Sequence, residues 1–130
     1  MRNGTYAIVA PLGICVATSA LFLTSWTASA EGDVAAGQQV FARCAPCHSA
    51  TPGQNLVGPS LAGVFGRKSG SEPGYSYSAA LKSANITWDE NSLDQFLSNP
   101  AGDVHGTKMF INVPNAADRQ NVIAYLKTLK

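Results

Sequence analysis

Charged residues are scarce in this chain of 130 residues, at 13% of the sequence, and the formal net charge is only +1. No large basic surface of the kind that holds nucleic acid is therefore expected. Histidine and methionine are also rare, with two of each, and there are three cysteines. The 45% hydrophobic content excludes a disordered chain, and the length allows one ordinary domain rather than a large catalytic scaffold. A domain this small usually needs a disulfide, a metal or a cofactor to stabilise it.

Residues 1–30 have the composition of a secretory signal peptide. One charged residue, Arg2, precedes an apolar run over residues 7–23, and Ala28–Ala30 is a small-residue cleavage motif. We therefore expect cleavage after Ala30 and export to the periplasm, with residues 31–130 as the mature domain. The alternative is a retained membrane anchor, because the apolar run approaches the length that spans a bilayer. Removing residues 1–30 leaves eight basic and eight acidic residues, so the mature domain carries no net charge.

The mature sequence contains Cys44-Ala-Pro-Cys47-His48, the signature for covalent attachment of a c-type haem. Two cysteines three positions apart on a helical turn present both sulfurs to the same side, where each thiol can add to a haem vinyl group. The imidazole of His48 then projects toward the iron as its first axial ligand. We therefore expect one covalently bound haem c, held by Cys44, Cys47 and His48.

Two other interpretations of the cysteine pair stay open. A thioredoxin-like dithiol would need the pair between a strand and a helix, whereas residues 37–43 before it have helical character. A zinc site would need four ligands, and the mature chain offers only Cys44, Cys47, His48 and His105. If the protein carries no haem, the two cysteines return to thiol chemistry.

Met109 is the expected sixth ligand of the iron, by elimination among the residue types that bind haem iron. It is the only methionine of residues 31–130, and it lies in a polar loop where packing into a core is not expected. A thioether opposite an imidazole raises the reduction potential and blocks outside ligands, which suits an electron carrier better than an enzyme. His105 and Lys108 are rival ligands in the same loop, and histidine titrates in the physiological pH range.

Capping residues predict where the main helices begin. Asp33 is expected to cap a helix that leads to the cysteine motif, and Asn115 to cap the final helix. Thr87 and Glu90 form a capping-box pattern for a third main helix, which should end before Pro100. No run of alternating apolar and polar residues indicates a strand. The mature domain is therefore predicted to be all-α.

Two further expectations concern a short helix and the packing of the first helix on the last. The short helix is predicted over residues 77–83. Gly37 and Phe41 should meet Val122 and Tyr125, with Gly37 allowing the two backbones to approach closely. This contact would bring the start and the end of the mature chain together.

The chain resembles the class I cytochromes c, and more narrowly the bacterial c2 type, which is related to mitochondrial cytochrome c. The motifs that carry this resemblance lie in order along residues 33–130: Cys44–His48, Gly58–Pro59, Gly63–Arg67, Tyr75–Tyr77, Ile86–Trp88, Leu97–Pro100, Gly106–Met109 and Ile123–Leu126. The resemblance implies a class I cytochrome c fold, in which three main helices, short helices and loops surround one covalently bound haem. One haem edge would be exposed for electron exchange.

The resemblance also implies roles for residues around the haem. The carbonyl of Pro59 would accept a hydrogen bond from the ring of His48 and orient it. Thr107 would donate toward the sulfur of Met109. Three residues would hydrogen-bond or neutralise the haem propionates: Arg67, Tyr77 and Trp88.

Three departures from the family pattern stand out. Phe96 replaces a usual tyrosine and Leu81 a frequent asparagine, which predicts a drier pocket near the methionine and an altered reduction potential of unassigned sign. His105 replaces a proline that stiffens the methionine loop, so this loop is expected to be more mobile. The segment that follows is one residue shorter than usual, which leaves two candidates, Phe110 and Ile111, for the aromatic position beside the haem edge.

The expected function is that of a soluble, monomeric shuttle for single electrons, with no catalytic residues. Its partners would be redox proteins such as cytochrome bc1, a terminal oxidase, a photosynthetic reaction centre or a periplasmic dehydrogenase, docked only transiently. A haem with a labile methionine that binds small ligands or peroxide is one alternative, and a dedicated acceptor for one dehydrogenase is another. The mature chain has only five lysines to steer docking, so binding should depend weakly on salt.

Overall fold

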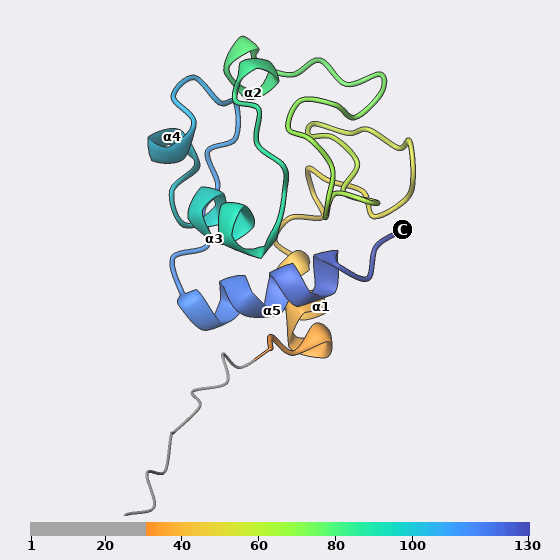
Figure 1. Cartoon of the computed structure of the whole chain (residues 1–130). Helices are drawn as coiled ribbons and strands as arrows, with labels where there is room; N and C mark the ends of the chain where they lie inside the picture. The colour runs from red at the N-terminus through yellow and green to blue at the C-terminus, as the bar shows by residue number, and fades with distance from the viewer. Residues whose placement is uncertain (1–30) are drawn as a thin grey trace, which may run out of the picture.

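The computed structural model describes residues 31–130, in which helices and long irregular loops surround a central core (Figure 1). The helices are α1 (Val34–Phe41), α2 (Ala79–Ser83), α3 (Glu90–Ser98), α4 (Pro100–Asp103) and α5 (Ala116–Leu126). Within the described part of the chain, the only β-type pairing is an isolated antiparallel bridge between Lys68 and Thr87. The predicted all-α fold is confirmed. The expected signal peptide at residues 1–30, with its boundary at Ala30, lies outside the described residues.

Two predicted helix starts are confirmed by their hydrogen bonds. At the start of α1, the carboxylate of Asp33 accepts a hydrogen bond from the backbone N of Ala36 at 2.7 Å. At the start of α5, the amide oxygen of Asn115 accepts from the backbone N of Asp118 at 3.0 Å. Each bond satisfies an N–H group that has no partner within the first helical turn.

The predicted cap of α3 is wrong by two residues. The N-cap is Asp89, whose carboxylate accepts from the backbone N of Ser92 at 2.8 Å, while Ser92 Oγ accepts from Asp89 N at 2.8 Å. This is a reciprocal capping box formed by an aspartate and a serine. Thr87 is instead paired with Lys68 in the isolated bridge, and Glu90 is the first helical residue.

The short helices also differ from the prediction. α2 begins at Ala79 rather than at Tyr77, because Ser78 provides its N-cap. α3 ends before Pro100, as predicted. The same proline then begins α4, which was not predicted, with Asn99 as its N-cap. Proline suits the first position of a helix because its fixed φ is helical and its missing N–H has no partner there.

α1 and α5 lie against each other at the base of the molecule in Figure 1. A Cβ atom on Gly37 would stand 2.0 Å from the carbonyl oxygen of Asn121, so a larger residue would force the backbones apart. The ring of Phe41 packs on that of Tyr125, with centroids 5.2 Å apart. Val122 is 1% exposed in the same region. The predicted contact between the first and last helices is confirmed.

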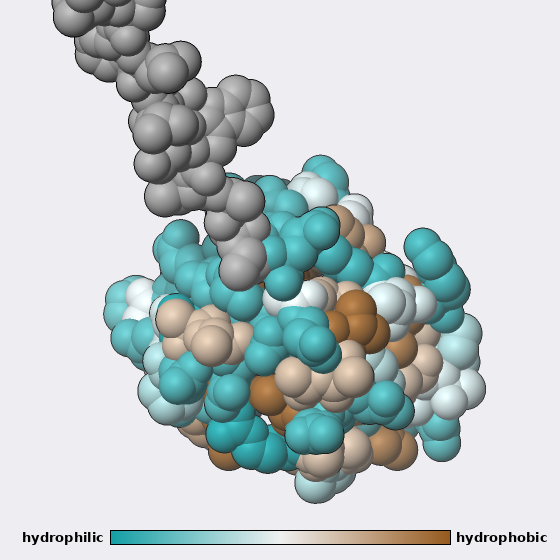
Figure 2. Space-filling view, turned by 90° about the horizontal axis from the view of Figure 1, so that it is seen from below, coloured by the Kyte–Doolittle hydropathy of each residue, from teal (hydrophilic) through white to brown (hydrophobic). Residues whose placement is uncertain are grey.

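The core lies between this helix pair and the loops above it. Its buried members are Phe41, Val64, Trp88, Leu93, Phe96, Leu97, Val104, Val113, Val122, Ile123 and Leu126. The face on the side of α1 and α5, seen from below in Figure 2, is largely hydrophilic, with apolar side chains only in small separate groups. Among residues 31–130, no helix has both the length and the apolarity that crossing a bilayer requires.

Candidate functional site

A cavity of about 460 Å³ lies between the long loop after α1, helix α3 and the loop before α5. We call it the central cavity. Eight of the nine predicted site residues line it: Cys44, Cys47, His48, Pro59, Arg67, Tyr77, Trp88 and Met109. The ninth, Thr107, is buried but does not line it. Residues that lie up to 65 positions apart in the sequence therefore surround one space.

The two cysteines lie on a tight turn that continues from α1. The backbone N atoms of Cys47 and His48 both donate to the carbonyl of Cys44, at 3.0 and 2.9 Å, and Gly58 N donates to the Cys47 carbonyl at 2.7 Å. Both thiols are half-buried and free. Burial raises the pKa of Cys44, an effect that the neighbouring guanidinium of Arg43 opposes. The turn thus presents two free thiols to the central cavity.

The ring of His48 is held in one orientation by the loop that follows it. Nδ1 lies 2.8 Å from the carbonyl oxygen of Pro59, the contact that the resemblance implies. A carbonyl can only accept, so the proton is on Nδ1 and the lone pair of Nε2 is left free. Burial lowers the pKa of His48, with the bond to Pro59 acting in the opposite direction. A neutral imidazole with a free nitrogen is the form that binds a metal.

Gly58 lies directly against this imidazole. A Cβ atom at this position would stand 2.3 Å from Cε1 of His48 and 2.9 Å from its Nε2. Only glycine leaves room for the ring in its present place. Gly58 belongs to a motif of the resemblance, but its contact with His48 was not predicted from the sequence.

The loop before α5 brings Met109 to the central cavity, where its side chain is half-buried. The backbone N of Met109 donates to Thr107 Oγ1 at 3.3 Å, and Lys108 Nζ donates to the carbonyl of Ser76 at 3.2 Å. The predicted donation from Thr107 toward the methionine sulfur stays a prediction. His105 is exposed and does not line the cavity, whereas Lys108 does.

One corner of the central cavity is polar. Arg67 donates from Nη1 to the carbonyl of Ala62 at 3.0 Å and from Nη2 to the carbonyl of Ser60 at 2.9 Å, and its Nη1 also pairs with the carboxylate of Glu72. Its Nε is the one buried side-chain polar atom without a partner among the described residues. The oxygen of Tyr77 accepts from Glu72 N at 3.3 Å, and burial raises the pKa of this phenol.

Glu72 was missed by the sequence analysis. No motif includes it, and the only available signal was that a buried arginine needs a countercharge. The resemblance implies that Arg67 meets the propionates, and in the structure the carboxylate of Glu72 already pairs with part of its guanidinium. Tyr75 was missed as well; it lines the cavity and donates from its hydroxyl to the carbonyl of Val57 at 2.8 Å.

The rest of the lining is mostly apolar. Phe96 packs on Trp88 with ring centroids 5.1 Å apart, and Leu81 lies in the same lining. Both residues therefore border the cavity, as the dry-pocket expectation requires. At the mouth of the cavity three apolar side chains are largely exposed: Val57 (76%), Phe110 (85%) and Ile111 (60%). We call these three residues the apolar rim.

This arrangement fits a haem. The cavity volume lies in the range of small-molecule sites, and the lining is mostly apolar with a few convergent polar groups. Two thiols match the two vinyl groups, and the nitrogen of His48 and the sulfur of Met109 match the two axial positions of the iron. The unpartnered Nε of Arg67 offers a donor to a propionate. A haem uses the thiols, the imidazole, the thioether and the guanidinium together, whereas a dithiol or zinc site would use only some of them.

The two alternatives for the cysteine pair do not fit the structure. In residues 31–130 the pair follows helix α1 and not a strand, so the thioredoxin-like arrangement is absent. Across the same residues there is no group of three or more His, Cys, Asp or Glu side chains placed to hold a metal ion, so the four-ligand zinc site is not formed.

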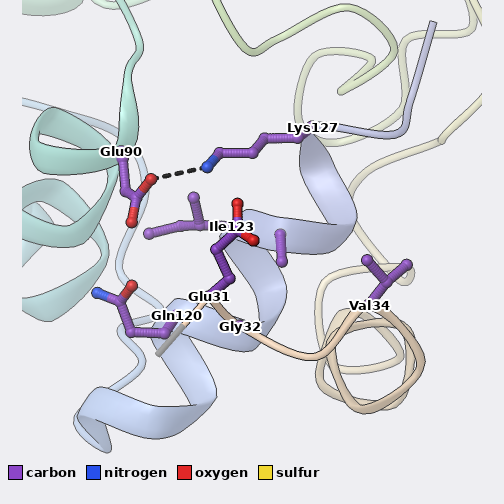
Figure 3. A pocket seen from close by; sticks show the side chains of 8 residues that line it. Glu31, Gly32, Val34, Glu90, Gln120, Ile123 and Lys127 are labelled. Carbon is purple, nitrogen blue, oxygen red and sulfur yellow. Dashed lines mark hydrogen bonds and ion pairs between the residues drawn. The ribbon is translucent and has the colours of Figure 1, made fainter. Parts of the chain in front are cut away.

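A second, smaller hollow of about 190 Å³ lies between the N-terminal segment of the described chain and α5. Figure 3 shows the ion pair between Glu90 and Lys127, 2.7 Å apart, at its edge, with Ile123 behind it. Its lining contains no cysteine, histidine or methionine. The central cavity is therefore the candidate site.

Known proteins are similar to this chain over the whole described domain. Residues 34–130 match the family described as cytochrome c. The chain is 50% identical over 101 residues to cytochrome c of Euglena viridis, and the matched region covers 76% of this chain and 99% of that protein. It is also 50% identical over 101 residues to cytochrome c2 of Rhodoblastus acidophilus, with a matched region that covers 76% of this chain and 94% of that protein. Cytochrome cH from Methylobacterium extorquens, a solved structure, is 45% identical with a TM-score of 0.70, over 75% of this chain and 99% of that one.

Proposed function

Because this chain belongs to the cytochrome c family, as a class I protein of the bacterial c2 type, we propose that it is a periplasmic shuttle for single electrons. It is an electron-carrier haem protein rather than an enzyme, and it carries one covalently attached c-type haem. The observation that carries the proposal is the convergence of Cys44, Cys47, His48 and Met109 on the central cavity.

We assign the attachment of the haem to the two cysteines. Each thiol would add across a vinyl double bond of the haem, with sulfur bonding to one carbon and the proton going to the other, so that no net oxidation would occur. Both cysteines are free and half-buried, and burial raises the pKa of Cys44, so this residue presents a thiol for such an addition. Because the haem would be attached next to His48, it could not dissociate from this ligand.

We assign His48 and Met109 as the two residues that would hold the iron. When bound, the haem would supply storage for one electron, because its iron can be Fe(II) or Fe(III). The chain's own part is to keep the ligands in place in both states: Pro59 and Gly58 fix the imidazole, and the bond from Met109 N to Thr107 fixes the methionine loop. Because the ligands stay the same, little reorganisation opposes electron transfer.

The apolar rim is the proposed docking edge for redox partners. Val57, Phe110 and Ile111 are exposed although they line the central cavity, so they surround the place where the haem would be nearest to solvent. Exposed apolar groups beside a buried cofactor are typical of an interaction site. With no net charge on residues 31–130, docking would depend on this apolar contact more than on long-range attraction.

The proposed cellular location and partners are supported by the family and by the composition of residues 1–30. Export with cleavage after Ala30 would leave residues 31–130 as a periplasmic monomer. In that compartment the protein would exchange electrons with cytochrome bc1, a terminal oxidase, a reaction centre or a dehydrogenase. N-terminal sequencing of protein recovered from periplasm tests the processing step directly, and a chain that still begins at Met1 would contradict it.

An absorption spectrum of the purified protein tests the function. We expect a low-spin c-type spectrum in both redox states, a weak band from the iron–methionine bond in the oxidised state, and no change with carbon monoxide. Denaturing mass spectrometry should find the haem still bound to the chain. A spectrum that responds to carbon monoxide would contradict stable ligation by Met109, and a chain without haem would contradict the proposal as a whole.

A further inference from the structure

The geometry points to Glu72 as a residue that lowers the reduction potential of the haem, by neutralising Arg67 inside the polar corner of the central cavity. This inference rests on the proposed function, because it assumes that haem occupies the cavity. It concerns a residue that none of the family motifs includes.

The ion pair between Arg67 and Glu72 is largely removed from water. The side chain of Arg67 is 17% exposed and that of Glu72 is 8% exposed. In surroundings of low dielectric constant, a carboxylate beside a guanidinium cancels most of its field at longer range. A propionate that approaches Arg67 therefore meets a pair with no net charge rather than a free cation.

The hydrogen bonds of Arg67 lead to the same conclusion. Nη1 and Nη2 are both engaged, with the carbonyls of Ala62 and Ser60 and with Glu72. Three of the five N–H groups of Arg67 are therefore engaged; one N–H of Nη2 and the N–H of Nε are left, and the buried Nε has no partner. Glu72 thus neutralises charge and takes up one N–H of the arginine that the family resemblance assigns to the propionates.

The backbone of Glu72 also contacts Tyr77. The backbone N of Glu72 donates to the hydroxyl oxygen of Tyr77 at 3.3 Å, so the hydroxyl proton of Tyr77 is free to be donated elsewhere. Tyr77 lines the cavity, so that proton is available to a propionate. The hydroxyl of Tyr77 is a neutral donor, so it can bind a propionate without adding the positive charge that an unpaired Arg67 would supply. The corner can therefore bind a propionate through hydrogen bonds while contributing little positive potential.

The consequence for electron transfer follows from charge. Reduction adds one electron to the iron, and negative charge nearby opposes that step while positive charge favours it. An ionised Glu72 therefore stabilises Fe(III) relative to Fe(II). Changing it to glutamine frees the charge of Arg67 and should make the haem easier to reduce.

The test compares Glu72→Gln with Glu90→Gln in the haem-loaded protein. Both variants replace an ion-paired glutamate with an amide of the same size, but Glu90 pairs with Lys127 at the second hollow and does not line the central cavity (Figure 3).

Midpoint potentials are measured by spectroelectrochemistry, and unfolding in urea is followed in parallel. We expect Glu72→Gln to raise the equilibrium constant for reduction by roughly threefold to thirtyfold, the range for one interior charge at an effective dielectric constant of about 20. Glu90→Gln should stay within about twofold of the parent protein.

A conservative variant separates charge from packing. Glu72→Asp keeps the carboxylate, so it should retain a potential near that of the parent even if the protein is less stable. If Glu72 acted only through structure, the aspartate and glutamine variants would shift the potential alike. Equal potentials for Glu72→Gln and the parent, in proteins with the same low-spin spectrum, would overturn the inference while leaving the proposed function intact.

A double variant covers the case in which Glu72→Gln alone does not bind haem. Arg67→Gln and Arg67→Gln/Glu72→Gln both lack the Arg67 donor and differ only in the charge of residue 72. The double variant should therefore have the higher equilibrium constant for reduction, by roughly threefold to thirtyfold. Equal constants for these two variants would mean that no charge on Glu72 acts on the haem, which would overturn the inference. Absence of a c-type spectrum in the parent protein would instead contradict the proposed function.

Discussion

The backbone of Gly58 lies so close to His48 that a Cβ atom there would stand 2.3 Å from Cε1 of the imidazole. The next residue, Pro59, accepts the hydrogen bond from Nδ1 of the same ring at 2.8 Å. Two consecutive residues therefore fix the proposed iron ligand, one by leaving space and one by orienting the proton.

Gly58→Ala should displace the imidazole and break its bond to Pro59. Overpacking of this kind lowers the free energy of unfolding by about 1–3 kcal/mol. We expect a loss of that size in urea unfolding of the haem-loaded protein, together with a high-spin fraction in its visible spectrum. Pro59→Ala is the control, because it keeps the carbonyl oxygen and should leave the spectrum low-spin. An unchanged spectrum and stability in Gly58→Ala would show that the ring has room elsewhere.

A second prediction concerns the crossing of α1 and α5. Gly37→Ala places a Cβ atom 2.0 Å from the carbonyl oxygen of Asn121, a backbone atom that cannot move away alone. The two helices must separate, so we expect the free energy of unfolding to fall by about 1–3 kcal/mol. Gln38→Ala, at an exposed position of the same helix, should stay within about 0.5 kcal/mol of the parent. Thermal and urea unfolding measure both, and equal losses would argue against the close contact.

Signals confined to a few neighbouring residues were predicted well from the sequence. The cysteine motif and His48 lie within one turn, and the caps Asp33 and Asn115 act on N–H groups three positions away. The close approach at Gly37 was predictable because a glycine on an apolar helix face has few other roles. The motif and the caps depend on residues that are near one another in the sequence. Gly37 was predictable for a different reason, because its residue type has few other roles at such a position.

Other features depend on contacts between distant segments, and these were missed or misplaced. The cap of α3 was assigned to Thr87, but pairing with Lys68 holds that residue in the isolated bridge and leaves Asp89 as the cap. Glu72 belongs to the site only because the chain folds back on Arg67. The contact of Gly58 with His48 likewise depends on the path of the loop. Sequence patterns do not report such paths, because they depend on packing rather than on local preference.

The Asp89 cap predicts a pH dependence of stability. Its hydrogen bonds with Ser92 lower the pKa of the Asp89 carboxyl below its usual value of 3.8. A group whose pKa is lower in the folded state adds stability above its unfolded pKa and loses this contribution as the pH falls through its folded pKa. We therefore expect the parent protein to lose stability below about pH 4, in part through Asp89.

Asp89→Asn tests this prediction, because asparagine caps a helix without titrating. Urea unfolding of both proteins between about pH 2 and pH 6 gives the difference in unfolding free energy as a function of pH. The advantage of the parent over the variant should be constant above about pH 4 and shrink as the pH falls below it. A difference that does not change with pH would show that the carboxylate charge contributes nothing to the cap. Comparing the two proteins removes the contribution of groups that titrate in both.

The last prediction concerns docking at the apolar rim. Phe110 is 85% exposed, so Phe110→Ser should change the free energy of unfolding by less than about 0.5 kcal/mol. We nevertheless expect the second-order rate constant for reduction by a purified cytochrome bc1 complex to fall at least several-fold, because an apolar contact at the cavity mouth is lost. Phe65→Ser is the control: this ring is 37% exposed, lies under Lys127 and does not line the central cavity.

Salt distinguishes this mode of docking from steering by a ring of lysines. Attraction between charged surfaces raises association rates by about 10–10³-fold and weakens steeply with ionic strength. Residues 31–130 carry eight basic and eight acidic residues, and Lys108 at the cavity is already hydrogen-bonded to Ser76. The rate constant for the parent should therefore change by less than about tenfold between low and physiological ionic strength. A steep decline with salt, together with a normal rate for Phe110→Ser, would assign docking to charge and remove the apolar rim from the mechanism.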